Sequence, residues 1–283
     1  MPPIPASALL PTRTAHLLAL SFSASYVGCL YVVGKLVPGP RDKPAVIRAR
    51  LAAVSVVSVA SCMVVGRLVS RSGQLWPLDA RTVKALGFVL PSSIYPCLQT
   101  PLLFLGPLYA AALSRFLFPE ASPSVSGFLR NLTTWIGFRN YAWAPLTEEV
   151  VFRSCVLAVY SMSGAARWKM VAFAPLVFGL AHVHHALDVY TRLGRTKKAL
   201  QQAVFSALFQ TAYTTLFGAH ASWLFLRSGS IVPPLVAHVF CNIMGVPQLG
   251  AEVQQMPQYK TSIYAAYLLG IGAFGWTIRS WTA

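Results

Sequence analysis

Residues 145–153 read P-L-T-E-E-V-V-F-R, and this stretch sets the expectations for the rest of the chain. The sequence has only seven acidic residues, and two of them, Glu148 and Glu149, are adjacent here. The surrounding segment, residues 141–162, is largely apolar. A carboxylate in a membrane-spanning helix costs about 2.5–3.5 kcal/mol on insertion scales. The doublet therefore indicates a functional site in a membrane helix.

Helix geometry separates the roles of the two glutamates. Glu149 and Arg153 stand at i and i+4, which predicts an ion pair on one helix face that supports the site. Glu148 is rotated by about 100° from Glu149 and faces Phe152 instead. It is then the carboxylate left free to act as a general base. Pro145 predicts that a helix begins here, because proline is favoured in the first helical turn.

The composition indicates a polytopic membrane protein of the all-α class. Of the 283 residues, 55% are hydrophobic and 11% are charged, whereas soluble domains carry about 25% charged residues. The net charge of +16 comes from basic residues in short loops between apolar runs. Such loops lie beside anionic lipid headgroups. Membrane lipid is therefore an expected partner, and nucleic acid is not.

Apolar runs predict about eight spanning or half-spanning helices around an intramembrane catalytic cavity. We expect a disordered tail over residues 1–14 and a single membrane-embedded domain over 15–283, with its motif core at 145–242. The first run has no clear A-x-A cleavage site, so we expect a spanning helix and not a removable signal peptide. The predicted runs are residues 16–36, 51–69, 85–118, 141–162, 170–187, 199–226, 231–246 and 261–281, of which 85–118 is broken by four prolines into a kinked helix or two short ones.

The five cysteines do not indicate a disulfide framework or a zinc site. They are scattered through apolar runs without a C-x-x-C pair. Cys155 lies near the acidic doublet but has no local histidine, so we interpret it as a small buried hydrophobe.

Two more polar motifs lie inside apolar helices. Residues 178–182 read F-G-L-A-H and continue with V-H-H to His184 and His185, and residues 238–242 read H-V-F-C-N. Phe178 and His182, like His238 and Asn242, share one helix face at i and i+4. Polar side chains avoid lipid. The three motifs are therefore expected to meet in one cavity.

The residue types suit hydrolysis of an amide inside or at the edge of the bilayer. Glu148 takes a proton from water, and His182 shares or orients that water. His238 and Asn242 donate hydrogen bonds to the developing oxyanion. No serine or cysteine nucleophile is required. Further candidates for substrate contact are Phe152, Phe178, His184 and His185.

Other readings remain open at this point. His182, His238 and a glutamate could hold zinc, although the sequence lacks the H-E-x-x-H motif of zinc proteases. The chain could be a non-catalytic membrane scaffold or an immunity-type homologue that binds a lipidated or peptide partner. A transporter with a protonatable carboxylate is a further alternative.

The three motifs resemble, in order, the E-E-x-x-x-R, F-x-x-x-H and H-x-x-x-N motifs of the type II CAAX prenyl endopeptidases. These enzymes belong to the wider glutamate intramembrane protease superfamily. The stretch A-H-V-H-H is more similar to the eukaryotic CAAX enzymes than to the bacterial immunity-type relatives. The motifs cover about a third of the chain, residues 145–242.

The resemblance implies a multi-pass protease of the endoplasmic reticulum membrane. Its expected substrates are farnesylated or geranylgeranylated CAAX proteins, such as Ras-like small GTPases, from which it removes the last three residues (aaX). No metal or other cofactor is implied. The residues that match the family's motifs are the water-activating pair Glu148 and His182, the supporting pair Glu149 and Arg153, and the oxyanion donors His238 and Asn242.

Overall fold

The computed structural model describes residues 10–70, 79–120, 124–180 and 185–282, and all regular structure in these ranges is helical. The expected all-α class is confirmed. In chain order, the α-helices are α1 (Thr12–Leu36), α2 (Pro44–Ser70), α3 (Ala80–Ala85), α4 (Tyr95–Leu103), α5 (Leu105–Leu117), α6 (Val125–Leu132), α7 (Trp135–Phe138), α8 (Ala144–Glu149), α9 (Val156–Met162), α10 (Arg167–Leu180), α11 (His185–Arg192), α12 (Lys197–Ser228), α13 (Val232–Met244), α14 (Leu249–Gln255) and α15 (Lys260–Thr277).

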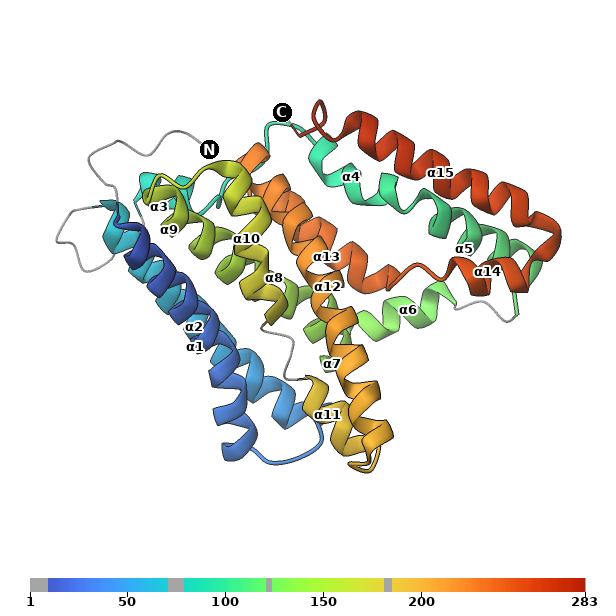
Figure 1. The fold of residues 1–283 in the computed structure, drawn as a ribbon, viewed down its shortest axis with the longest axis horizontal. Helices are drawn as coiled ribbons and strands as arrows, with labels where there is room; N and C mark the ends of the chain where they lie inside the picture. Colours follow the sequence, from blue (N-terminus) through green and yellow to red (C-terminus); the bar gives the residue numbers. More distant parts are fainter. Residues whose placement is uncertain (1–9, 71–78, 121–123, 181–184, 283) are drawn as a thin grey trace.

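Helices α1 and α2 pack side by side as a long antiparallel pair at one edge of the molecule (Figure 1). Both are long and apolar enough to cross a membrane. Two bent pairs, α4 with α5 and α13 with α14, raise the number to four in the described ranges if each pair is one span. Apolar side chains such as Leu20, Val56 and Leu268 are exposed on the outside. This surface is the one expected of a multi-pass membrane protein.

The proline-broken run forms two short helices. Helices α4 and α5 meet at Phe104 with a bend of 65°. Pro101 lies inside α4 and removes one backbone donor there. Both helices pack against α15 on the far side of the molecule from α1 (Figure 1).

Pro145 lies in the first turn of the α-helix α8, as predicted, but the chain is already helical before α8 begins. Helix α7 continues through a π-helical turn, Arg139–Trp143, directly into α8. The Ala144 N–H donates to the carbonyl of Arg139, five residues back. A π-helical turn shifts the hydrogen-bond register by one residue. The chain is therefore helical on both sides of Ala144, and Pro145 still occupies the first turn of an α-helix, where proline is tolerated.

The same segment forms the centre of the core. After α8 comes a second π-helical turn, Val150–Cys155, and then α9. Side chains from Val151 to Val159 are buried, and the segment contacts α1 and α2 on one side and α10 and α12 on the other. Tertiary packing therefore holds the acidic doublet in a fixed place.

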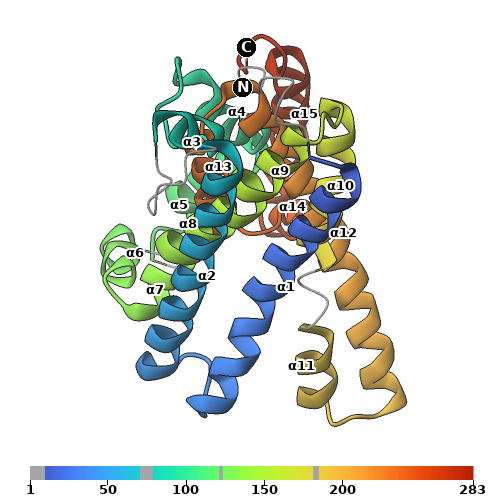
Figure 2. The same cartoon turned by 90° about the vertical axis from the view of Figure 1, so that its left-hand side faces the viewer.

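Helices α10 and α12 pack closely against each other. A Cβ on Gly218 of α12 would lie 2.8 Å from the Cβ of Pro175 in α10, so only glycine fits. Small residues allow this close approach between membrane helices. Helix α12 runs through the molecule from α11 at its lower end to the loop before α13 (Figures 1 and 2).

Candidate active site

Glu149 is a fully buried carboxylate that serves two partners. Its Oε2 lies 3.2 Å from Nε of Arg153, so the ion pair expected at i and i+4 is formed. Its Oε1 accepts a hydrogen bond from Nδ1 of His238 at 2.7 Å. The second partner was not predicted, because His238 is 89 residues away in the chain. Glu149 therefore links the acidic segment to α13.

Glu148 lies beside His238, a neighbour that helix geometry alone does not predict. Its Oε2 is 3.7 Å from Nε2 of His238, and its side chain is 21% exposed. A carboxylate can only accept, so Nδ1 carries a hydrogen toward Glu149 while Nε2 is the ring nitrogen on the Glu148 side. The imidazole thus stands between two carboxylates, one buried and one accessible.

The guanidinium of Arg153 is enclosed by aromatic rings. Its carbon atom lies 4.4 Å from the ring centroid of Phe178 and 5.5 Å from that of Phe217. Desolvated cation–π contacts of this kind contribute about 2 kcal/mol. Phe152 packs edge-on between Phe178 and Tyr26. Of the two phenylalanines expected to touch substrate, only Phe178 lines the cavity described below.

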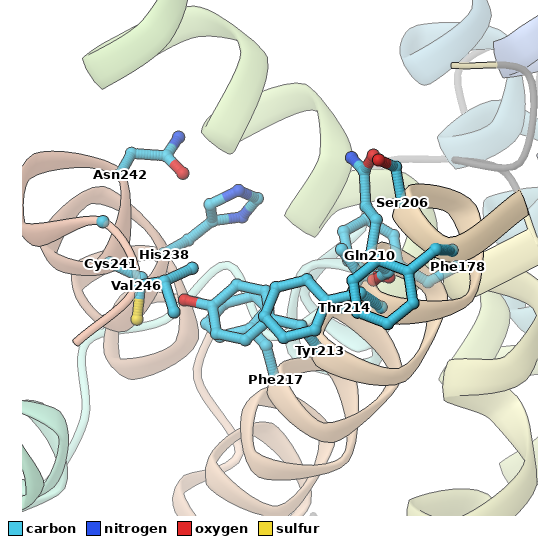
Figure 3. A pocket seen from close by; sticks show the side chains of 13 residues that line it. Phe178, Ser206, Gln210, Tyr213, Thr214, Phe217, His238, Cys241, Asn242 and Val246 are labelled. Atoms are coloured by element: carbon cyan, nitrogen blue, oxygen red, sulfur yellow. The ribbon is translucent and has the colours of Figure 1, made fainter. Parts of the chain in front are cut away.

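Asn242 fixes α13 against the turn that leads into α8. One N–H of its amide donates to the backbone carbonyl of Asn140 at 2.8 Å. An amide nitrogen has two hydrogens, so a second N–H remains for a ligand. His238 and Asn242 project from the same face of α13 (Figure 3).

A cavity of about 550 Å³ opens beside this face. Its size falls within the range of about 300–1,000 Å³ found for ligand pockets. In Figure 3, His238 and Asn242 lie on one side of the cavity, and Ser206 and Gln210 lie on the other. The cavity is lined by Phe178 from α10, by Phe205, Ser206, Phe209, Gln210, Tyr213, Thr214 and Phe217 from α12, and by His238, Cys241, Asn242, Gly245 and Val246 from α13 and its end.

The structure brings Glu148, His238 and Asn242 to one place, although Glu148 reaches the cavity wall only through its contact with His238. His182 and His184 lie outside the described residues. His185 begins α11, and its side chain also lies outside the described part. Among the residues that the structure describes, no group of three or more His, Cys, Asp and Glu side chains could hold a metal ion.

Most of the cavity wall comes from α12, for which the sequence predicts only a membrane span. Its seven lining residues follow two interleaved four-residue spacings, F-x-x-x-F-x-x-x-Y-x-x-x-F from 205 to 217 and S-x-x-x-Q-x-x-x-T from 206 to 214. The regular row of polar side chains in an otherwise apolar helix is the feature of the sequence that could have predicted this role of α12 in the cavity wall.

Tyr26 in α1 was also missed, although it holds α8 in place. Its hydroxyl lies 2.9 Å from the hydroxyl of Thr147, the residue before Glu148, and both side chains are buried. The Thr147 hydroxyl donates to the carbonyl of Trp143 in its own helix. The Tyr26 hydroxyl is therefore the donor in the contact between α1 and α8.

We expect Tyr26→Phe to lower stability by about 1 kcal/mol, because it leaves a buried acceptor without its donor. Activity should fall through kcat with little change in KM, since Glu148 loses its support and the cavity stays intact. Thermal unfolding and steady-state kinetics measure the two effects. The variant Thr147→Val combined with Tyr26→Phe removes both polar groups, so it should not be less stable than Tyr26→Phe alone. Additive losses would contradict this pairing.

Comparison with known proteins assigns the chain to a family. The family model described as "Type II CAAX prenyl endopeptidase Rce1-like" matches residues 130–244. This range contains all three motifs, and it runs from α6 to the end of α13.

Two similar proteins extend the match over most of the chain. CAAX prenyl protease 2 of Homo sapiens is 36% identical over 273 residues, which cover 90% of this chain and 77% of that protein. Probable CAAX prenyl protease 2 of Schizosaccharomyces pombe is 31% identical over 264 residues, which cover 92% and 90%. No solved structure matches the chain. Identity of 36% and 31% over at least 90% of this chain and at least 77% of each relative shows that the chain belongs to the type II CAAX prenyl endopeptidase family.

Proposed function

We propose that this chain is an intramembrane endopeptidase that removes the last three residues from prenylated CAAX proteins, with a glutamate and histidines as its chemical groups. The similarity to CAAX prenyl proteases supports the activity. The observation that carries the assignment to residues is the contact of 3.7 Å between Glu148 and His238, at the wall of a cavity inside the helix bundle.

In the proposed reaction, water attacks the carbonyl carbon of the bond that follows the prenylated cysteine. Glu148 takes a proton from this water as it attacks, and His182 orients the water. The C–N bond then breaks, and the proton passes from Glu148 to the leaving amine. The products are a new carboxylate on the prenylcysteine and a free tripeptide.

His238 and Asn242 are proposed to stabilise the oxyanion of the tetrahedral intermediate. Nδ1 of His238 donates to Glu149, so this role requires a second hydrogen on Nε2, the ring nitrogen that lies 3.7 Å from Glu148. Asn242 has one amide hydrogen beyond its bond to Asn140. Loss of one preorganised donor lowers kcat by about 100- to 1,000-fold in other hydrolases. Glu149 orients the imidazole and balances the charge of Arg153.

We propose the endoplasmic reticulum membrane as the location and Ras-like small GTPases as one group of substrates. The resemblance of the three motifs to the eukaryotic enzymes supports both. Co-localisation of a fluorescently tagged chain with a marker of the endoplasmic reticulum tests the location. Cleavage of peptides from the C-termini of different prenylated proteins tests the range of substrates.

The activity itself is tested with purified protein and a farnesylated C-terminal peptide, followed by mass spectrometry. We expect one product that is shorter by three residues, together with the free tripeptide. Stepwise loss of single residues, or no product, would contradict an endopeptidase. The unprenylated peptide is the matched substrate and should be cleaved far more slowly, because it lacks the apolar chain that draws the substrate to the membrane.

A second arm of the same assay contains a strong zinc chelator. We expect the rate to stay unchanged when the chelator is present from the start. Loss of activity that returns on addition of zinc would favour the zinc-dependent reading instead.

A further inference from the structure

Helix α12 presents two parallel rows of side chains to the cavity. Phe205, Phe209, Tyr213 and Phe217 form an aromatic row, in which each residue follows the last by four positions. Ser206, Gln210 and Thr214 form a polar row with the same spacing. Adjacent residues on an α-helix are about 100° apart, so the two rows run side by side along one surface of α12.

The aromatic row begins at the candidate catalytic residues. The ring of Phe217 lies 5.0 Å from the imidazole of His238, measured between centroids. Phe205 is twelve residues away, which is about 18 Å along the helix. Its side chain is 71% exposed and that of Phe209 is 53% exposed. The row therefore leads from the catalytic end of the cavity to the outer, apolar surface of the molecule.

The polar row has unused hydrogen-bonding capacity. The Thr214 hydroxyl donates to the carbonyl of Gln210, and its oxygen can still accept. Within the described part of the chain, the side-chain amide of Gln210 has no hydrogen-bond partner. In Figure 3, Gln210 and Ser206 lie across the cavity from His238 and Asn242. An extended peptide between the two sides would reach polar groups from both α12 and α13.

We propose that the two rows of α12 divide the substrate between them: the aromatic row binds the prenyl chain, and the polar row binds the backbone of the C-terminal tripeptide. This inference rests on the proposed function. A prenylated CAAX end has one apolar and one polar branch that meet at the cysteine, next to the bond to be cleaved. The two rows run side by side toward the end of the cavity that His238 occupies, so the two branches can lie next to each other on α12 with the cysteine at that end.

Two competing ligands measure the contribution of each row separately, because each ligand carries only one branch of the substrate. S-farnesylcysteine methyl ester has the prenyl chain without the tripeptide, and an unprenylated CAAX peptide has the tripeptide without the prenyl chain. We expect Phe209→Ala to weaken binding of the farnesyl compound roughly 10-fold and to leave peptide binding within twofold. We expect Gln210→Ala to weaken peptide binding roughly 5-fold and to leave binding of the farnesyl compound unchanged.

Leu208→Ala and Gln202→Ala are the matched controls. Both residues are exposed on α12, and neither lines the cavity. Neither variant should change the binding of either competitor. Phe209→Leu keeps an apolar side chain and should fall between Phe209→Ala and the unaltered protein.

Binding is measured by displacement of radiolabelled farnesylated peptide, so the readout does not require cleavage. If both competitors bind with the expected pattern but no peptide is cleaved, the proposed endopeptidase activity is wrong, whereas the binding roles assigned to the two rows of α12 are supported. If peptide is cleaved but each variant weakens both competitors equally, or neither variant weakens either, the division is wrong. Failure of both competitors to bind would also overturn it.

Discussion

Replacing Glu148 with alanine is expected to abolish cleavage of a farnesylated peptide while the protein remains folded. The variant removes the proposed general base, a group that contributes about 100- to 10,000-fold to the rate. Its effect on stability should be small, because the side chain is 21% exposed and its contact with His238, at 3.7 Å, is longer than a hydrogen bond. Rate constants and thermal unfolding of the purified variant measure the two quantities.

Glu120→Ala is the control for this experiment. Glu120 is an exposed glutamate in the connector after α5, so its removal changes the net charge by the same amount without touching the cavity. It should keep full activity. If Glu148→Ala retained more than a tenth of the rate of the unaltered protein, Glu148 could not be the base. An equal loss in Glu120→Ala would point to an effect of charge alone.

The helices were predictable because the membrane imposes a simple rule. In lipid, the backbone N–H and C=O groups of a segment must form hydrogen bonds within the protein, so each long apolar run is expected to be helical. Each predicted run corresponds to one or more helices in the described ranges. The prolines in residues 85–118 correctly predicted a broken helix. Pro145 correctly predicted the first turn of α8. It did not predict the π-helical turn before α8, in which the Ala144 N–H donates to the carbonyl of Arg139.

Whether the sequence predicts a contact in the site depends on how far apart the two residues lie in the chain. The pair of Glu149 and Arg153 follows from helix geometry alone, so the sequence predicted it. The bond from His238 to Glu149 depends on how α13 packs against α8, which spacing within one helix cannot reveal. The same packing brings His238 to 3.7 Å from Glu148.

The rows on α12 show a different limit of sequence reasoning. An aromatic row such as that from Phe205 to Phe217 has the same pattern whether it faces lipid or a substrate. Only the packing of α12 against α10 and α13 places it at the cavity. The polar row was the more informative signal, since hydrogen-bonding side chains are costly against lipid.

Replacing Glu149 with alanine is expected to cause the largest loss of stability of any single change in the site. Glu149 is fully buried, and Arg153 is only 1% exposed. Removal of one partner of a buried ion pair costs about 3–5 kcal/mol, because the remaining charge is uncompensated. Among the described residues, the two terminal nitrogens of Arg153 have no hydrogen-bond partner that could take over. Activity should also be lost, since His238 loses the acceptor that orients it.

Asp42→Ala is the matched control, because it removes an ion pair at the surface. Asp42 lies 2.9 Å from Arg139, and its side chain is 64% exposed. Pairs of this kind contribute about 0–1 kcal/mol. Denaturant unfolding of both variants in the same detergent should therefore show a large loss for Glu149→Ala and little change for Asp42→Ala. Equal losses would mean that burial does not govern the energy of the Glu149 pair.

A double variant separates the structural role of Glu149 from its role in the reaction. Glu149→Leu together with Arg153→Met replaces both charges with apolar side chains, and such replacements are often neutral or stabilising. We expect this variant to recover most of the stability lost in Glu149→Ala. It should remain inactive, because leucine cannot accept the hydrogen bond from Nδ1 of His238. Recovery of cleavage along with stability would show that Glu149 acts only in folding, and His238 would then need no carboxylate to hold it.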